Sequence, residues 1–372
     1  MSTKIEWADI TINPVVGCSH CSPGCDHCYA ERFAARLAKN PKTAAKYAGV
    51  VDERGKWTGK VNLHMDGCLH AATVTRKPKR FFIGSMTDIF HENIPDEEIR
   101  SLFLAMTIVP NDFPTYMVLT KRPQRAQAVL GDMLVACPEL HRVWLGVTVC
   151  NQAEADAKIP VLLQTPAAVH FVSIEPMLGP VDLQAAYPHD WMHCKICGWY
   201  GPDDGEGGAD HITNEDGSEP ICPQCGNDGE AGEFDWTREA ASAYRETILP
   251  GLNWVICGGE TGPGARPLHP DWVRGLRDQC AAAGTPFFFK GWGEWCPRFN
   301  HYLYGMDDSA NMIDPTEKRW ETQEVTVSGE TDLAKVPYRE LDWVTRVGKR
   351  RSGRLLDGRE WNEVPEYHAD PK

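Results

Sequence analysis

Residues 9–31, DITINPVVGCSHCSPGCDHCYAE, join a predicted β-strand at 9–16 to a loop that carries Cys18, Cys21, Cys25 and Cys28. Cysteine thiolates are soft ligands, and a tight loop is suited to wrap an iron–sulfur cubane. A strand that runs directly into such a loop indicates a metal or cluster site at the end of a β-sheet.

The chain downstream alternates strand-like and helix-like patterns. Apolar runs rich in β-branched and aromatic residues occupy 80–87, 114–120, 142–149, 168–174, 253–257 and 285–290. Helical patterns lie between them at 96–109, 123–137 and 270–283, with Pro123 at a permitted first position and Gly284 placed for a C-cap. Strands that alternate with helices predict parallel pairing through right-handed crossovers.

The spacing of these segments predicts an α/β fold of the TIM-like barrel type, full or partial, with about seven strands. An open doubly wound sheet is the alternative. One gap exceeds the roughly 30 residues of a βα unit by about fifty, which predicts an insertion over 187–236. The predicted domains are 1–186 and 237–296 for the two parts of the barrel, 187–236 for the insertion, and 297–372 for a C-terminal extension with a basic cluster.

The composition excludes some classes of protein. The chain has 372 residues, a formal net charge of −14 and 14 cysteines. No apolar stretch reaches the length of a membrane span, and the N-terminal MSTKIEWADITINP lacks the basic and apolar regions of a secretory signal. We therefore expect a cytoplasmic protein without a membrane partner, whose cysteines bind metal rather than form disulfides.

The acidity of the chain is local. Residues 190–235 hold twelve Asp or Glu and one Lys, which leaves a formal charge of −3 for the rest. That remainder carries basic clusters at 76–80 and 349–359, and the chain has 13 Trp. A solvated face is the commoner meaning of such clusters, but basic grooves with aromatic platforms suit single strands or flipped bases. Nucleic acid therefore stays among the expected partners.

Two CxxC pairs lie inside the predicted insertion. Cys194 and Cys197, and then Cys222 and Cys225, are each followed by Gly. Four thiolates on two tight turns are the ligand set of a structural zinc ribbon, and the polar stretch between them needs such a metal to fold. A redox pair is the weaker alternative. The other cysteines are expected to be small buried residues: Cys68, Cys137, Cys150, Cys257, Cys280 and Cys296.

The N-terminal spacing Cys21-x3-Cys25-x2-Cys28 is typical of radical S-adenosylmethionine enzymes. In such enzymes three thiolates hold a [4Fe–4S] cluster, and the fourth iron stays open for S-adenosylmethionine. Cys18 keeps two alternatives open, a closed four-cysteine cluster and a second zinc knuckle, since four ligands would leave no open iron. The spacing favours radical chemistry over both.

Polar residues follow almost every predicted strand, where a TIM-like barrel collects its chemistry. Binding of S-adenosylmethionine is assigned to Ser85, Asp88, Thr120, Lys121, Arg122, Gly258 and Gly259, with Ser85 and Asp88 on its ammonium and Lys121 or Arg122 on its carboxylate. Catalytic or substrate contacts are assigned to Glu175, Glu260 and Lys290. The stretch 258–260, GGE, is similar to the glycine-glycine-glutamate element that contacts the ammonium in radical enzymes, although it follows a late strand. Its glycine pair has a second interpretation, a turn where two backbones approach closely.

The chain also resembles the phage- and prophage-associated three-Cys-motif family, which is radical-SAM-like and of undefined substrate. The resemblance covers nearly the whole chain through KIEWADITINPVVGC, SPGCDHCYAER, GSMTDIF, LTKRP, SIEPMLGP, CGGETGPGARP, FFFKGWGEW and GRLLDGREWNEVP. It implies Cys18, Cys25 and Cys28 as the cluster ligands, whereas the standard spacing implies Cys21, Cys25 and Cys28. The third ligand is therefore open. A phage origin also implies a partner protein encoded nearby.

These observations predict a radical S-adenosylmethionine enzyme that uses a 5′-deoxyadenosyl radical to abstract hydrogen from an unknown substrate, with nucleic acid as one candidate. Its expected cofactors are a [4Fe–4S] cluster, S-adenosylmethionine and Zn²⁺. Its expected electron donor is of the flavodoxin or ferredoxin type. The alternative is a non-catalytic, metal-stapled module that binds nucleic acid or protein.

Overall fold

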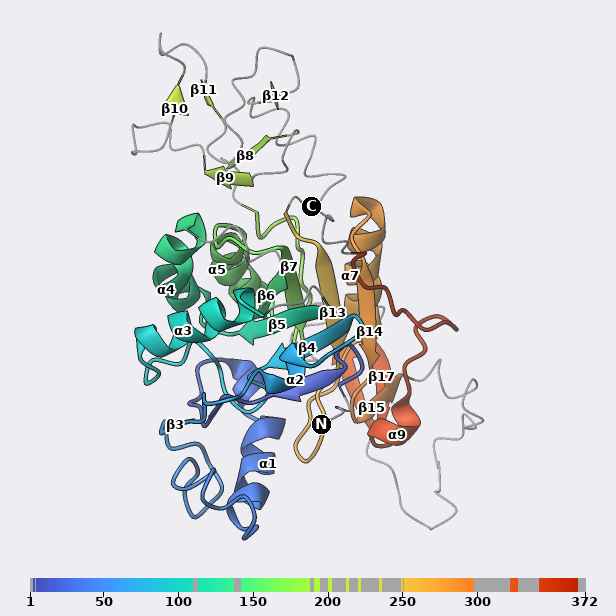
Figure 1. The fold of residues 1–372 in the computed structure, drawn as a ribbon. Coiled ribbons are helices and arrows are strands. Elements are labelled where there is room, and N and C mark those ends of the chain that lie inside the picture. Colours follow the sequence, from blue (N-terminus) through green and yellow to red (C-terminus); the bar gives the residue numbers. More distant parts are fainter. Residues whose placement is uncertain are drawn as a thin grey trace.

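The largest part of the molecule is one seven-stranded parallel sheet that curls into a half-barrel (Figure 1). The computed structural model describes residues 3, 5–109, 113–136, 142–187, 191–194, 200–202, 212–213, 220–221, 234–235, 249, 251–297, 322–326 and 341–366. In spatial order the strands are β1 (Ile10–Ile12), β4 (Lys79–Ile83), β5 (Pro114–Thr120), β6 (Val143–Thr148), β7 (Val169–Ile174), β13 (Trp254–Gly258) and β14 (Phe287–Gly291). The α/β prediction with seven parallel strands is confirmed.

The strand order decides between the two predicted architectures. Each strand of the sheet lies beside the one that precedes it along the chain, so the order never reverses. A doubly wound sheet requires a reversal, whereas a barrel does not. Within the described residues β1 and β14 are not paired with each other, so this barrel is partial rather than full.

Two predicted strands have different bounds in the structure. The strand predicted at 80–87 stops at Ile83, because Gly84 adopts φ +86° and turns the chain. The segment predicted as one strand at 9–16 divides into β1 and β2 (Val15–Val16), and β2 pairs antiparallel with β3 (Asn62–Leu63).

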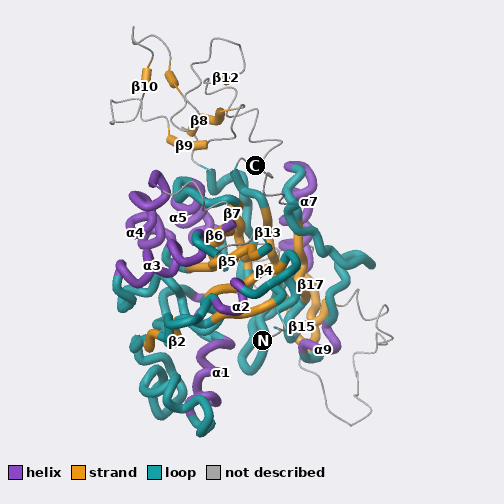
Figure 2. Tube along the Cα trace, in the orientation of Figure 1, coloured by secondary structure: helices purple, strands orange, loops and turns teal. Residues whose placement is uncertain are grey.

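Helices cover the convex face of the sheet (Figure 2). The helices are α1 (Tyr29–Ala38), α2 (His70–Thr73), α3 (Asp96–Thr107), α4 (Pro123–Ala136), α5 (Gln152–Leu163), α7 (Pro270–Ala283) and α9 (Lys349–Ser352). The predicted helix starts are confirmed for α3, α4 and α7, and Gly284 ends α7 at φ +66° as a left-handed cap. In the described part of the chain, none of these helices combines the length and apolar character that a bilayer crossing needs.

Successive strand residues divide between two cores. Phe81 and Val172 pack on the convex face beneath the helices, while their neighbours Phe82 and Phe171 point into the concave face. The concave cluster is an aromatic plug, made chiefly of Trp7, Phe82, Trp144, Phe171, Trp254 and Phe288. Gly146 makes room for this plug, because a Cβ there would lie 2.5 Å from the Phe171 ring. The plug fills the concave face along these strands.

The C-terminal segment covers the outer edge of β14. After a small sheet of β15 (Trp295–Pro297), β17 (Leu341–Arg346) and β16 (Thr322–Thr326), residues 353–366 return along β14. Phe289 donates its backbone N–H to the Trp361 carbonyl at 2.9 Å, and Trp254 Nε1 donates to the Glu363 carbonyl at 2.8 Å. The unpaired hydrogen-bonding groups of an edge strand are thereby satisfied within the chain.

The predicted zinc ribbon lies largely outside the described residues. In this region the structure describes the backbone of β8 (Trp191–Cys194), β9 (Tyr200–Pro202), β10 (Ile212–Thr213), β11 (Pro220–Ile221) and β12 (Phe234–Asp235). Cys197, Cys222, Cys225 and Cys137 are outside it, as is the side chain of Cys194. The zinc ribbon therefore stays a prediction. Among the scattered cysteines, Cys150, Cys257, Cys280 and Cys296 are buried as predicted, while Cys68 is partly exposed.

Candidate functional site

The cysteine loop lies between β2 and α1, beside the carboxyl end of β4. Thr87 donates its hydroxyl to the Gly17 carbonyl at 2.6 Å, which fixes the start of the loop on the strand end. Farther along, Ser22 caps a 3₁₀ turn, η1 (Pro23–Cys25). Gly24 has no room for a side chain, because its Cβ would lie 2.5 Å from the sulfur of Cys150. A short and closely packed loop is the result.

All four N-terminal cysteines line one pocket. From the loop side it is lined by Cys18, Ser19, His20, Cys21, Cys25, Cys28, Tyr29, Ala30 and Trp57. From the sheet it is lined by Phe82, Gly84, Ser85, Thr87, Asp88, Leu119, Thr120, Lys121, Arg122 and Thr148. Five predicted cofactor residues, Ser85, Asp88, Thr120, Lys121 and Arg122, are thus brought together with the thiols. Among the described residues, no three His, Cys, Asp or Glu side chains already stand as a metal-binding group.

The thiols of the pocket differ in their electrostatic surroundings. A hydrogen bond from the Cys21 thiol, aided by the Lys121 ammonium, lowers the pKa of Cys25 to about 5. The same bond raises the pKa of Cys21. Burial, together with the nearby charge of Asp88, raises the pKa of Cys18 to about 11. The pocket therefore favours the thiolate at Cys25 and the neutral thiol at Cys18.

Asp88 organises the sheet side of the pocket. Its carboxylate is only 6% exposed and accepts from the Thr120 hydroxyl at 2.7 Å and the Lys121 backbone N–H at 2.9 Å. It also accepts from the Phe90 backbone N–H at 3.0 Å and from the Arg122 guanidinium at 3.1 Å. Both oxygens are engaged within the protein, so Asp88 holds the end of β5 in place.

Arg122 and Lys121 are adjacent but differ in their contacts. Besides Asp88, the Arg122 guanidinium donates to Glu92 at 2.9 Å and to the Ser19 hydroxyl at 2.8 Å. The Lys121 ammonium makes no hydrogen bond or ion pair with the described residues, although Lys121 lines the pocket. Burial alone would lower the pKa of Lys121, but the neighbouring Cys25, Cys150 and Cys28 raise it overall. Lys121 is the cation of the pocket that is available to a ligand.

The predicted GGE stretch belongs to a strap that crosses the cysteine loop. We define the strap as residues 258–266. Glu260 is 6% exposed and accepts from Arg266 Nε at 2.9 Å and Nη2 at 2.6 Å. Arg266 also donates to the Pro23 carbonyl at 2.8 Å and to Asp26 at 3.1 Å, so it ties the strap to the loop. Arg32 on α1 donates to the Thr261 carbonyl at 2.9 Å and adds a second tie.

The remaining predicted site residues lie outside the thiol pocket. Lys290 and Glu175 form an ion pair of 2.6 Å, and each side chain is about one-fifth exposed at 20% and 21%. Gly258 packs against both of them, since its Cβ would lie 3.3 Å from Lys290 and 3.5 Å from Glu175. At Gly259 two backbone segments approach closely, as the second interpretation of the glycine pair expects. A Cβ at this position would lie 2.2 Å from the Trp292 carbonyl oxygen.

Several residues of the site were not found from the sequence. Ser19 and Glu92 hold Arg122, and Arg266 holds Glu260, yet the sequence prediction assigned none of these three residues to the site. Arg122 lies 30 residues from Glu92 and 103 from Ser19, whereas Arg266 lies only six residues from Glu260. One usable signal lies in the quoted CGGETGPGARP. Arg266 follows Glu260 by six residues there, so the two opposite charges could have been predicted to pair.

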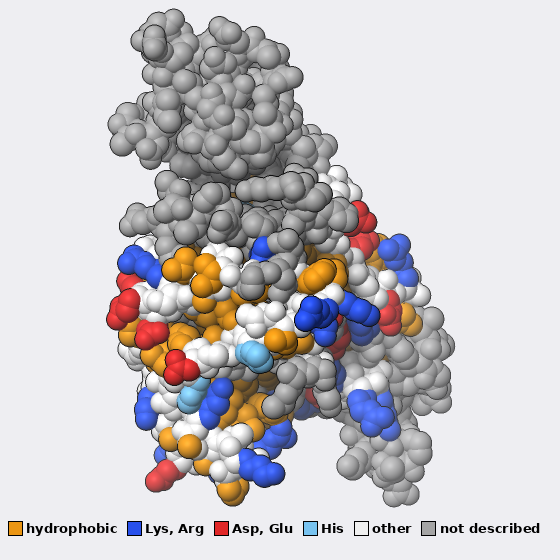
Figure 3. Space-filling view, in the orientation of Figure 1, with side chains coloured by type: hydrophobic (Ala, Val, Ile, Leu, Met, Phe, Trp, Pro, Cys, Tyr) orange, Lys and Arg blue, Asp and Glu red, His pale blue; other side chains and the backbone are white. Residues whose placement is uncertain are grey.

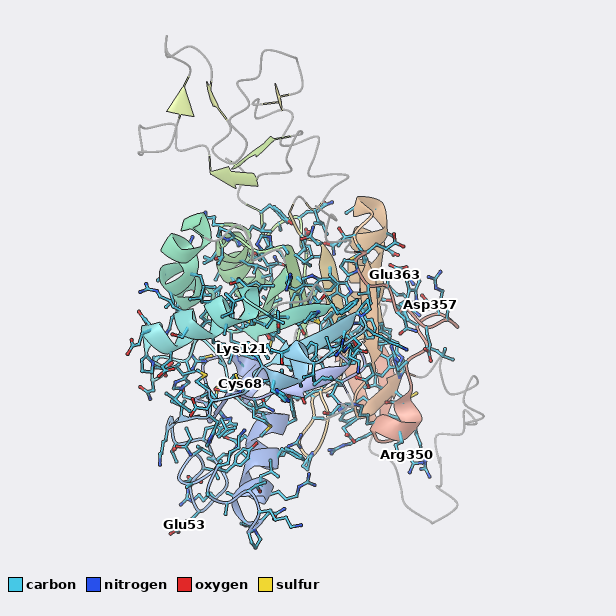
Figure 4. The ribbon with its side chains drawn as sticks, viewed as in Figure 1. Glu53, Cys68, Lys121, Arg350, Asp357 and Glu363 are labelled. Carbon is cyan, nitrogen blue, oxygen red and sulfur yellow. The ribbon has the colours of Figure 1, made fainter. Side chains whose placement is uncertain are left out.

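The basic clusters lie at opposite ends of the sheet. The cluster at 76–80 precedes and begins β4, at the amino edge of the sheet. The second cluster contains α9, which lies just beyond the carboxyl end of β14. The backbone N–H groups of Val347 and Gly348, which precede α9, both donate to the Glu294 carbonyl at 3.0 Å. Arg350 of α9 projects outward from the body of the protein (Figure 4). On the face shown in Figure 3, basic side chains are scattered among acidic and hydrophobic ones.

The fold and the pocket together define an α/β half-barrel protein with a thiol-lined site at the carboxyl ends of its strands. Within that class, the chain belongs to the family described as "Protein of unknown function (DUF5131)", which matches residues 2–365. No curated protein matches the chain.

Among solved structures, spore photoproduct lyase in complex with dinucleoside spore photoproduct is 12% identical, with 93% of this chain and 71% of that chain covered and a TM-score of 0.37. A cysteine-to-serine mutant of the same enzyme is 15% identical, with 47% and 48% covered and a TM-score of 0.32. The chain spans about half the length of that mutant structure. These likenesses are weak.

Proposed function

We propose that this protein is a radical S-adenosylmethionine enzyme whose cluster is held by Cys21, Cys25 and Cys28. The observation that carries the proposal is the pocket at the carboxyl edge of the sheet, where four thiols of one loop meet Lys121. Hydrogen abstraction from a bound substrate is the proposed reaction. The cluster would supply the electron that cleaves S-adenosylmethionine to a 5′-deoxyadenosyl radical.

The donor set of the pocket fits an iron–sulfur cluster. Thiolates are the ligands such clusters require, and the loop offers more than the three that a cluster with one open iron needs. Each of the Cys21 and Cys25 thiols is the largest influence on the pKa of the other, which indicates that these two ligands lie close together. The Cys18 thiol instead donates to the Ser19 carbonyl at 3.5 Å. We therefore assign Cys21 as the third ligand.

The other pocket residues take roles that follow from their contacts. Lys121 binds the carboxylate of S-adenosylmethionine, because its ammonium is not engaged by a described residue. Ser85 and Thr148 offer hydroxyls for other polar groups of the ligand. Asp88 and Arg122 act as positioning residues for Lys121 and the loop. Glu175, which follows β7, and Lys290 on β14 pair across the intervening β13 and face the substrate, and Glu260 secures the strap.

Three further parts of the proposal rest on the sequence. A zinc ribbon forms from Cys194, Cys197, Cys222 and Cys225. A flavodoxin- or ferredoxin-type protein supplies electrons. A nucleic acid is the first substrate class to screen, because α9 places Lys349 and Arg350 at the same edge of the sheet as the thiol pocket. A phage origin and a partner protein encoded nearby belong to the same proposal.

The test is anaerobic reconstitution of the full chain. We expect brown protein with about four irons per chain that releases 5′-deoxyadenosine when reduced with S-adenosylmethionine. Colourless protein that binds only zinc would overturn the proposal in favour of a metal-stapled binding module. Loaded protein is then incubated with DNA, RNA and nucleotides, and consumption of each is followed by mass spectrometry.

A further inference from the structure

A buried carboxylate holds one histidine at the edge of the thiol pocket. Glu31 on α1 is only 2% exposed, and its Oε1 lies 2.9 Å from Nε2 of His20. The same carboxylate accepts from Lys56 Nζ at 2.9 Å and from the Trp57 backbone N–H at 2.8 Å. These contacts fix Glu31 rigidly, so the His20 ring has a firm support on one side.

The hydrogen bond determines which nitrogen of His20 is available. An ionised carboxylate can only accept, so Nε2 carries the proton that it donates to Glu31. In the tautomer that donates from Nε2, Nδ1 carries a lone pair. No hydrogen bond joins Nδ1 to a described residue, and the ring lines the same pocket as the four thiols.

This arrangement is the one that metal-bound histidines adopt. A ligating His almost always donates its other ring N–H to a carboxylate or carbonyl, which fixes the tautomer and raises the basicity of the ligating nitrogen. Glu31 provides that support to His20. The side chain of His20 is 37% exposed, which leaves the ring able to move aside when a larger ligand enters.

A second histidine of the loop provides the contrast. His27 lies between Cys25 and Cys28 in the sequence but does not line the pocket. Its ring packs instead against the strap, within 2.6 Å of where a Cβ of Gly264 would lie. Sequence spacing alone would rank the two histidines equally, whereas the structure separates them.

We propose that Nδ1 of His20 binds the iron that three cysteines leave open, and that S-adenosylmethionine displaces it. The inference rests on the proposed function, since it requires a cluster in this pocket. Ligation forms one dative bond from nitrogen to iron and transfers no electron. His20 would thereby protect the open iron from water and thiols between turnovers.

Pulsed electron paramagnetic resonance of the reduced, reconstituted protein tests this ligation. We expect a strong hyperfine coupling between the cluster and one nitrogen. The coupling should change from that of ¹⁴N to that of ¹⁵N in protein labelled with ¹⁵N only in histidine. The histidine coupling should disappear when S-adenosylmethionine is added. His20→Gln should lose the coupling and keep its iron, whereas His27→Gln should keep both.

The outcomes separate this inference from the proposed function. Brown protein with a full iron content but no histidine coupling in the labelled wild type overturns the His20 ligation alone. The same coupling in His20→Gln as in wild type also overturns it. Colourless protein overturns the proposed function and the ligation together. The labelled wild-type protein gives its answer even if a variant fails to fold.

Discussion

At the scale of single residues, Lys121 and Arg122 show how neighbours in the sequence take different roles. Arg122 is held by Asp88, Glu92 and Ser19, so its charge is already used within the protein. Lys121 contributes its backbone N–H to Asp88 and leaves its ammonium in the pocket. The sequence predicted both cations at this strand end but could not assign their roles, because the carboxylates that distinguish them lie on a different segment.

Lys121→Gln should weaken S-adenosylmethionine binding without unfolding the protein. A hydrogen bond to a charged group is worth about 1.5–3 kcal/mol, which corresponds to roughly a 10- to 150-fold rise in Kd. Equilibrium binding of S-adenosylmethionine to reconstituted protein measures the change. Lys77→Gln is the control, since Lys77 is exposed and lies at the opposite edge of the sheet. Equal affinity in the two variants would remove Lys121 from the binding site.

The third cluster ligand can be identified by two substitutions. Cys21→Ala should abolish cluster formation, because the Cys21 and Cys25 thiols lie together. Cys18→Ala should retain iron and colour, since the Cys18 thiol is directed to the Ser19 carbonyl. Iron content and the visible absorption spectrum after reconstitution measure the result. The reverse pattern would instead assign Cys18, as the family resemblance implies.

At the scale of elements, the strands and main helices could be predicted, while the strap could not. Each strand is a run of apolar residues, so burial on both faces of the sheet is visible locally in the sequence. The strap has no such pattern. Its fold depends on Arg266 reaching Pro23 and Asp26, a contact between segments about 240 residues apart. Long-range polar contacts leave no periodic signal, so the sequence predicts Gly258 and Gly259 as cofactor residues and Glu260 as a catalytic or substrate contact, without the tie to the loop.

Arg266→Ala should destabilise the strap more than a matched surface substitution does. It leaves the Glu260 carboxylate, whose side chain is 5% exposed, without its charged partner, at a cost of about 1.5–3 kcal/mol. Arg274→Ala is the matched control. The Arg274 side chain is 30% exposed and that of Arg266 is 31% exposed, but the Arg274 partner, Asp357, has a side chain that is 38% exposed. We expect that control to cost less than about 1 kcal/mol.

Denaturant unfolding of the full chain measures both variants. Arg266→Lys should recover part of the loss, since it keeps the charge but not the paired contacts. A loss for Arg266→Ala no larger than that for Arg274→Ala would show that the strap is held by other contacts, such as the one from Arg32 to Thr261.

At the scale of the whole molecule, the half-barrel depends on its C-terminal segment to cover β14. Ending the chain at Ser352 should produce aggregation, because it removes the segment that bonds to Phe287 and Phe289 and the buried Leu356. Figure 4 shows Glu363 and Asp357 on this segment beside α7. Ending the chain at Glu366 is the control and should remain monodisperse in size-exclusion chromatography. Equal behaviour of the two truncations would contradict this role.

Metal content should divide between two parts of the chain. A Cys222→Ser and Cys225→Ser double variant should lose zinc and keep iron, because a zinc ribbon in 187–236 is predicted to fold separately from the thiol pocket. Cys25→Ser should lose iron and keep zinc. Elemental analysis of reconstituted protein gives both values. Loss of both metals in either variant would mean that the insertion and the barrel fold as one unit.

The sequential strand order also affects how the chain folds as it is synthesised. β1, β4, β5, β6 and β7 can pair in turn as each emerges, since each neighbour is already present. β7 must then wait for β13, which begins roughly 80 residues later, or about 4–16 s at a synthesis rate of about 5–20 residues per second. During that interval β7 is an uncovered edge of a nascent sheet. Slow codons or chaperone contacts within the insertion would act during this interval, and the length of the insertion therefore sets how long β7 stays uncovered.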